Sequence, residues 1–184
     1  MTAAPPDGRA PADNGDRLRR RVLWAMPTGL YVIGSRAEID SVTRRNLMTA
    51  NLVVQVSTDP KLIGAAIDSS SVTRGLVEAG GAFTVSFLAR GDRAVVRRFV
   101  KPVTDVECDR AGRAISMAGV AVTEAPSGAP VLAGAVAWLD CQVRQHLDLG
   151  SHLLFIAAVT ATEGPDGDMP PVLRMEDTRM NYGG

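Results

Sequence analysis

One stretch constrains the fold more than any other. Residues 44–81 contain two apolar runs of strand length, a tight turn between them and a helix start rich in hydroxyl groups. The first run, Asn46 to Val56, mixes small, polar and β-branched residues, and the second is Leu62 to Ile67. The residues between them, Ser57 to Pro60, are typical of a turn. The pattern predicts a hairpin or a tightly linked pair of strands.

The second run leads into a hydroxyl-rich segment, Asp68 to Arg74, and a short apolar stretch closed by Gly80 and Gly81. This order predicts a short helix with a glycine stop. Backbone N–H groups at the start of a helix bind phosphate, and serine and threonine hydroxyls and an arginine add to such a site. An ordinary serine-rich helix cap with an exposed arginine is the other interpretation, and this segment alone does not decide between them.

The remaining elements are also short. Four further segments have the composition or alternation of strands: Thr28 to Ile33, Phe83 to Leu88, Val136 to His146 and Leu153 to Val159. In Phe83 to Leu88 the alternation predicts two unlike faces, and in Val136 to His146 it predicts one core face and one wet or interfacial face. Short helices are expected from Leu18 to Met26 and after Asp92 as N-cap. Strands joined by turns favour an antiparallel barrel over a doubly wound parallel sheet.

Composition narrows the classes of function. A chain of 184 residues with zero formal net charge is most simply one domain, and no broad field attracts nucleic acid or an anionic membrane. Residues 1–17 are polar and rich in proline and glycine, so we expect a disordered tail before a domain from 18 to 184. No apolar run approaches about 20 residues, and the two cysteines, Cys108 and Cys141, match no metal or dithiol spacing. We expect a cytoplasmic protein with free thiols.

No motif for protein-side covalent catalysis is present. The sequence lacks a G-x-G-x-x-G, a Walker loop, H-E-x-x-H, G-x-S-x-G and paired carboxylates at helical spacing. His146, Asp148 and His152 could be imagined as metal ligands, but no thiol or carboxylate cluster supports them. A turn histidine near an active site is the favoured interpretation, and we predict no metal.

Taken in order from about Leu23 to the C-terminus, the motifs resemble the flavin reductase-like, FMN-binding split-barrel family. The resemblance rests on P-T-G before a strand, N-L-M-T-A-N, V-S-T-D-P, S-S-x-T, a glycine-ended helix and F-T-V-S-F-L. Three later segments add to the resemblance. Arg93 to Phe99 resembles the family's short charged helix, and Gly150 to His152 resembles its G-D-H turn. The family's "P-x-L … L-x-C" strand resembles Pro130 to Leu132 together with Ala137 to Cys141.

The resemblance implies a mainly β fold with short helices, a Greek-key, antiparallel split β-barrel. It implies FMN, with FAD as an alternative, in a shallow groove usually near a dimer interface. Asn46, Leu47, Met48, Thr49 and Ala50 would run along the isoalloxazine and ribityl chain, with Val56 and Ser57 continuing that wall. Ser69, Ser71 and Thr73 would hold the phosphate, with Arg74 as a further partner. His152 would be the catalytic residue beside the ring, where NAD(P)H or a substrate docks.

Two departures accompany the resemblance. Ser151 stands where the family usually has aspartate, which leaves His152 without that neighbouring carboxylate, and Lys61 replaces a proline at a turn. The ending Arg179 to Gly184 resembles a tail found in some members, where an aromatic could pack on the flavin or across a dimer.

Three functions follow from the resemblance. The leading one is a homodimeric NAD(P)H-dependent flavin reductase, which could supply reduced flavin to a partner monooxygenase. The second is a non-catalytic flavin-binding or electron-transfer protein of the flavoredoxin type. The third is a split barrel that binds another ligand, such as pyridoxal phosphate, haem or a deazaflavin.

Overall fold

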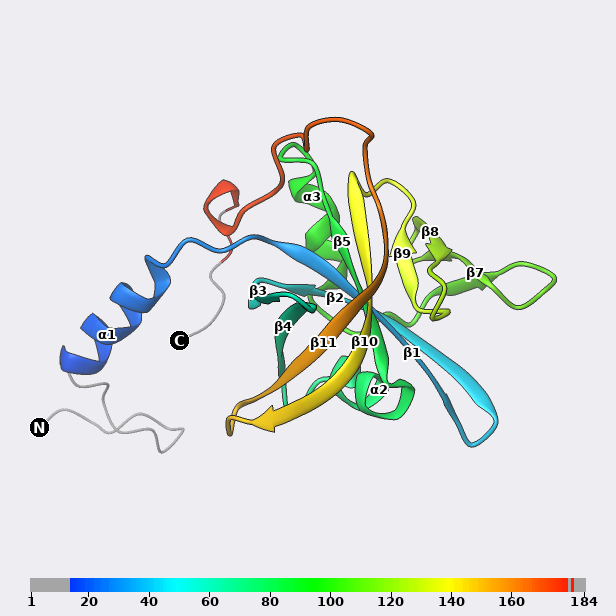
Figure 1. Ribbon diagram of the computed structural model, residues 1–184, viewed down its shortest axis with the longest axis horizontal. Coiled ribbons are helices and arrows are strands. Elements are labelled where there is room, and N and C mark those ends of the chain that lie inside the picture. Colours follow the sequence, from blue (N-terminus) through cyan, green and yellow to red (C-terminus); the bar gives the residue numbers. More distant parts are fainter. Residues whose placement is uncertain (1–13, 179, 181–184) are drawn as a thin grey trace, which may run out of the picture.

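The computed structural model describes residues 14–178 and 180, and antiparallel strands are the main secondary structure of this part (Figure 1). The helices are α1 (Asn14–Trp24), α2 (Val72–Gly80) and α3 (Arg93–Val96), with 3-10 turns η1 (Arg97–Phe99) and η2 (Met175–Asp177). The strands are β1 (Tyr31–Ile39), β2 (Val42–Ala50), β3 (Val53–Thr58), β4 (Lys61–Asp68), β5 (Ala82–Phe87), β6 (Val106–Cys108), β7 (Ala114–Met117), β8 (Val120–Glu124), β9 (Pro130–Leu132), β10 (Ala137–Asp148) and β11 (His152–Glu163). The prediction of a mainly β, antiparallel fold with short helices is confirmed.

The large sheet is closed into a barrel by a short connection. Its strand order is β2-β1-β5-β10-β11-β4-β3, so β2 and β3 form its two edges. These edges are consecutive in the chain and only Asn51 and Leu52 join them. Three Cα–Cα steps span at most about 11 Å, so the two edges must approach each other at this end. The barrel is therefore split between β2 and β3, beside the Asn51-Leu52 connection.

Two hydrophobic cores lie on opposite faces of β1. Ile33 belongs to the core inside the barrel with Ile67, Phe83 and Phe155, all nearly or fully inaccessible to solvent. Val32, which precedes Ile33, belongs to a second core that also contains Leu47, Phe99, Met117 and Leu173. That second core lies where η1, the small sheet β6-β7-β8-β9 and the C-terminal segment meet the barrel. Both cores are needed because alternate side chains of one strand point to opposite faces.

Strand β5 has the two unlike faces that the alternation predicts. The alternation in Phe83 to Leu88 correctly predicted a strand, but both of its faces are buried. Its polar positions are hydrogen-bonded to β9: the Thr84 hydroxyl donates to the Pro130 carbonyl at 2.6 Å, and the Ser86 hydroxyl accepts from the Leu132 N–H at 3.1 Å. Polar side chains are thus buried at little cost because each has a partner.

Strand β10 departs from its expected faces for a related reason. Asp140 was assigned to the wet or interfacial face, but it is buried, and its Oδ2 accepts the Ser127 N–H at 2.8 Å. A register shift between Asp140 and Cys141 also breaks the strict alternation.

The helix predictions agree with the structure in position and differ in detail. Helix α2 has the expected cap and stop: Ser71 is its N-cap, and Gly81 ends it in the left-handed conformation, at φ 67°. Asp92 precedes α3 as expected, but its side chain makes no capping hydrogen bond. Helix α1 begins at Asn14, inside the segment assigned to a disordered tail, and residues 1–13 lie outside the described part.

Candidate functional site

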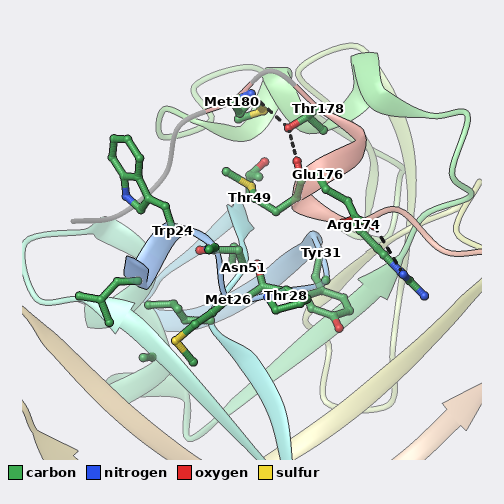
Figure 2. A pocket seen from close by; sticks show the side chains of 18 of the residues that line it. Trp24, Met26, Thr28, Tyr31, Thr49, Asn51, Arg174, Glu176, Thr178 and Met180 are labelled. Atoms are coloured by element: carbon green, nitrogen blue, oxygen red, sulfur yellow. Dashed lines mark hydrogen bonds and ion pairs between the residues drawn. The ribbon is translucent and has the colours of Figure 1, made fainter. Parts of the chain in front are cut away.

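A cleft of about 950 Å³ opens where the barrel is split. Its lining comes from three parts of the chain: residues 23–29 before β1, residues 48–52 at the end of β2 and in its connection to β3, and the C-terminal segment from Val172 to Met180 (Figure 2). Ala66, Asp68 and His152 complete it from β4 and β11. Concave, mainly apolar sites of this size are typical of small-molecule binding.

The end of β2 forms one side of the cleft. Met48 is half-buried against the barrel core, and Ala50 is part of that core. The Thr49 side chain is buried, and its hydroxyl donates to the Val96 carbonyl at 2.5 Å, which anchors β2 to the end of α3. The connection that follows is tied to β4, because the Ala66 N–H donates to the Leu52 carbonyl at 2.9 Å. This side of the cleft is therefore rigidly supported.

An apolar wall faces it from the segment before β1. Trp24 and Met26 line the cleft while 49% and 63% of their surface remains exposed. Tyr31 packs edge-on against Phe87, with ring centroids 5.1 Å apart, and burial raises the pKa of its phenol. A Cβ at Gly29 would overlap the Tyr31 ring as it lies here, so glycine leaves room for the ring where the chain enters β1. Flat aromatic and thioether surfaces of this kind suit a planar ligand.

The C-terminal segment closes the third side. It is held to the entry of β1 by two backbone hydrogen bonds, from Leu30 N–H to the Leu173 carbonyl and from Met175 N–H to the Thr28 carbonyl, both 3.0 Å. The Asp177 carboxylate binds the Arg90 guanidinium at 2.7 Å. That hydrogen bond, together with one from the Arg174 N–H, holds the pKa of Asp177 below its ordinary value.

His152 and Asp68 form the polar end of the cleft. His152 is the first residue of β11, and its Nδ1 lies 2.9 Å from the Ser151 hydroxyl. Asp68 is the last residue of β4 and accepts hydrogen bonds from Ser70, from the hydroxyl at 2.5 Å and from the N–H at 2.7 Å. The Ser70 bonds, the hydroxyl first, hold the pKa of the Asp68 carboxyl below its ordinary value, and positive charge on His152 lowers it too.

The structure brings four of the residues predicted from the sequence into this cleft: Met48, Thr49, Ala50 and His152. The other predicted residues lie outside it. Val56 and Ser57 are on the edge strand β3, at a register shift, and Leu47 is buried in the second core. Their assignment to a flavin site stays a prediction.

Asn46 and Thr73 are joined in the interior. The Asn46 amide donates to the Thr73 hydroxyl at 2.8 Å, and its oxygen accepts the Val103 N–H at 2.9 Å. Both side chains are buried, 3% and 0% exposed, so the Thr73 hydroxyl faces the protein interior. In this structure the pair fastens α2 to β2.

The remaining predicted residues gather at the start of α2, which follows Asp68. The Ser69 hydroxyl donates to the Gly150 carbonyl at 3.0 Å, and the Ser71 hydroxyl donates to the Asp68 carbonyl and accepts the Arg74 N–H. Arg74 pairs with Glu78 at 3.1 Å, while its Nε is buried without a partner among the described residues. The first N–H groups of a helix have no intrahelical acceptor; Ser71 binds that of Arg74, and those of Val72 and Thr73 remain available.

Sequence reasoning missed several cleft residues. Asp68 was noticed only as part of the serine cluster, and Tyr31 only as a strand residue. The available signal for Asp68 was its position at the end of an apolar run, just before the hydroxyl-rich segment. The segment from Val172 to Thr178 carried no such signal, because its place in the cleft depends on pairing with the entry of β1. Of the tail from Arg179 to Gly184, only Met180 is within the described residues, and it lines the cleft.

The described part of the chain has neither a cluster of metal ligands nor a membrane-spanning helix. Among the described residues, no three His, Cys, Asp or Glu side chains come together as a metal ion would require. No helix in the described part of the chain is long and apolar enough to cross a membrane.

Comparison with known proteins gives a consistent result. The model of the flavin reductase like domain matches residues 23–183. The NADH-dependent FAD reductase of Streptomyces globisporus is 32% identical over 155 residues, covering 83% of this chain and 80% of that protein. The NADH-dependent flavin reductase StyB of Pseudomonas fluorescens is 29% identical over 154 residues, covering 84% and 82%.

Solved structures agree. The Streptomyces globisporus NADH:FAD oxidoreductase in complex with NAD and FAD fragments superposes with a TM-score of 0.65 at 28% identity, covering 85% of this chain and 87% of that one. Relatives differ in length, and the chain spans 57% of a curated relative, the stachydrine N-demethylase reductase subunit of Rhizobium meliloti strain 1021, at 27% identity and 79% of this chain.

Proposed function

The chain belongs to the flavin reductase-like domain family, and on this premise we propose that it is an NAD(P)H-dependent flavin oxidoreductase. One observation carries the proposal: the split in the barrel brings Met48, Thr49 and Ala50 together with His152 around a single cleft. These are the positions that the family resemblance assigns to the flavin ring and to the docking of nicotinamide. Among its described lining residues the cleft has no serine or cysteine that could act as the nucleophile of a hydrolase.

The residues present fit a flavin at both ends. At the ring end, Trp24, Tyr31 and Met48 supply apolar surface, and the buried Thr28 hydroxyl has no hydrogen-bond partner among the described residues. A polar edge of a ligand would satisfy it. We place the ring here, with FMN as the first candidate and FAD as the second. When bound, the flavin supplies the redox chemistry, while the protein binds it, orients it and excludes water.

The phosphate is assigned to the start of α2. The free N–H groups there, including that of Thr73, are suited to an anion. Ser69 and Ser71 surround them, and the nearby cation is Arg74, which pairs with Glu78 while its Nε has no partner among the described residues. Because the Thr73 hydroxyl is buried against Asn46, we assign its contribution to its N–H alone.

The reductant is assigned from relatives and charge. Two relatives are named NADH-dependent reductases. In this cleft Asp68 and Glu176 add two carboxylates, and the one described arginine in the lining, Arg174, lies 3.5 Å from Glu176. The additional 2′-phosphate of NADPH would meet unfavourable charge, which supports NADH over NADPH.

Partners are assigned on similar grounds. One structural relative is the flavin reductase of a styrene monooxygenase from Pseudomonas putida S12, with a TM-score of 0.64, 29% identity and coverage of 85% and 90%. We propose that this chain also passes reduced flavin to a monooxygenase or another electron acceptor.

A homodimer is part of the same proposal. Leu18, Val22, Leu23 and Met26 expose 58–63% of their surface on or just after α1, which projects from the barrel (Figure 1). Exposed apolar side chains of this number favour a covered surface. The two free cysteines, Cys108 and Cys141, suit the cytoplasmic location included in the proposal.

Electron transfer without nicotinamide is the second candidate. Ser151, in place of the family's aspartate, favours it because it leaves His152 without a carboxylate in the adjacent position. Such a protein would bind flavin and be reduced by dithionite or a protein partner, but it would not oxidise NADH.

The test is a pair of measurements on the purified full chain. Flavin affinity is measured by fluorescence titration with FMN and FAD, and NADH and NADPH oxidation is then followed with and without flavin. We expect flavin binding and flavin-dependent oxidation that is faster with NADH. Flavin binding without nicotinamide oxidation would favour electron transfer, and the absence of both would overturn the proposal.

A further inference from the structure

His152 and Asp68 face each other across two neighbouring strands. In the antiparallel pairing of β11 with β4, His152 is the register partner of Asp68. Directly opposite residues in such a pair point to the same side of the sheet, with Cβ atoms about 5 Å apart. Both residues also line the cleft. The fold thus brings a carboxylate beside the histidine from a strand far away in the sequence.

Each of the two side chains keeps one polar atom unused. The Ser151 hydroxyl occupies Nδ1 of His152, and Nε2 makes no hydrogen bond to a described residue. Ser70 occupies Oδ1 of Asp68 with two hydrogen bonds, and Oδ2 makes none within the described chain. The serine therefore fixes the ring at one nitrogen, and the carboxylate is left free to act through its charge.

Other charged groups near this end are already engaged. Asp148, the last residue of β10, accepts the Gly150 N–H at 2.7 Å. Arg174 and Glu176 approach from the C-terminal segment and pair with each other at 3.5 Å. Asp68 is the carboxylate that the adjacent strand contributes, and the charge of His152 is one of the causes of its lowered pKa, after the Ser70 hydrogen bonds.

We propose that Asp68 is the positioning residue of His152, and that it supplies from strand β4 the negative charge that Ser151 does not supply. The carboxylate favours the protonated imidazole, in which Nδ1–H donates to Ser151 and Nε2–H is the donor left for a ligand in the cleft. The inference rests on the proposed function in one respect, the placing of His152 where nicotinamide docks.

The first test needs neither flavin nor nicotinamide. The chain has two histidines, so their ring signals can be titrated separately by NMR, with His152→Gln to assign them. We expect Asp68→Asn to move the His152 titration midpoint to lower pH and to leave His146 unmoved, because removal of a nearby negative charge disfavours the protonated imidazole. The amide retains Oδ1 for Ser70, so the turn is preserved. An unmoved His152 midpoint would overturn the proposal.

His146 provides the matched control. It lies on the neighbouring strand β10 as the register partner of Phe155, and its Nε2 lies 4.0 Å from the Glu78 carboxylate. Glu78→Gln should move the His146 midpoint and not that of His152. If Asp68→Asn moved both histidines equally, the effect would be a general change of charge or fold, and the specific pairing would be wrong.

The second test is kinetic. In Asp68→Asn the alkaline limb of the kcat profile should move to lower pH by the same amount as the NMR midpoint, with flavin affinity unchanged. The double variant Asp68→Asn/Ser151→Asp places a carboxylate next to His152 in the sequence. It should return the alkaline limb of the kcat profile to its wild-type position. Failure of this rescue, with the NMR shift present, would overturn the positioning role. A wild-type protein without flavin-dependent turnover would instead overturn the proposed function, while the NMR result would still stand.

Discussion

At the scale of single residues, the structure assigns different work to two neighbouring hydroxyls. Ser71 caps α2, and Thr73, two residues on, is buried and accepts a hydrogen bond from Asn46. The sequence alone suggested that both were phosphate ligands. Side-chain direction separates them, because residues two apart in a helix do not share a face.

Thr73→Val tests this distinction. The methyl group replaces the acceptor of the Asn46 amide with little change of shape, so a buried donor loses its partner. We expect the free energy of unfolding, measured by urea denaturation, to fall by about 1–3 kcal/mol. Thr73→Ser, which keeps the hydroxyl, is the control and should lose less. Flavin affinity should stay near that of the wild type, and a large selective loss of affinity would show that the hydroxyl binds phosphate after all.

The sequence predicts the roles of residues that depend on their immediate neighbours. It does not predict roles that depend on a strand far away in the chain. The Ser71 cap and the Gly81 stop were predicted because a helix end depends on its own few residues. The burial of Asp140 and the pairing of Asp68 with His152 were not predicted. Both depend on sheet register, which a one-residue shift would change completely.

At the scale of elements, the contact between β1 and β9 is unusually close. A Cβ at Gly34 would overlap the Pro130 carbonyl and the Thr84 hydroxyl that donates to it. Glycine is thus needed for β9 to lie against the barrel.

Substitution of two glycines tests this packing. Gly34→Ala should force β1 and β9 apart and lower the free energy of unfolding by about 1–3 kcal/mol. Gly75→Ala is the matched control, because a Cβ there meets nothing within 4 Å and the residue lies inside α2. That variant should be more stable by roughly 0.5–1 kcal/mol. Equal stability of the two variants would contradict the close contact.

The C-terminal segment is expected to depend on pH through Asp177. Its pKa is lowered in the folded protein, first by the Arg90 hydrogen bond, so its stabilising contribution is present above the unfolded value of about 3.9. That contribution is lost as the pH falls through the pKa that Asp177 has in the folded protein, which is lower than its pKa in the unfolded chain. The difference in unfolding free energy between wild type and Asp177→Asn should therefore be constant at neutral pH and shrink below about pH 4.

The control for this series is Asp166→Asn, at an exposed position in the preceding loop. Its difference from wild type should remain flat over the same range. A constant difference for Asp177→Asn across the acid range would mean that the Arg90 pair does not hold the segment.

At the scale of the whole molecule, the cleft results from how the barrel closes. The two-residue connection between β2 and β3 leaves a split, and segments from both ends of the described chain cover its sides. Short runs and turns in the sequence were enough to predict an antiparallel barrel. The side of the cleft formed by the C-terminal segment could not be predicted, because its position depends on the pairing of Gly29 with Arg174 and of Ala89 with Val172.

The most direct test of the account is a single-turnover measurement without oxygen. The protein with bound flavin is mixed with NADH, and the loss of visible flavin absorbance is followed in wild type and His152→Ala. We expect fast reduction by wild type, slowed at least roughly tenfold in the variant, with a much smaller change in flavin Kd. Reduction no faster than that of free flavin in solution would contradict the assignment of this cleft as the place of hydride transfer.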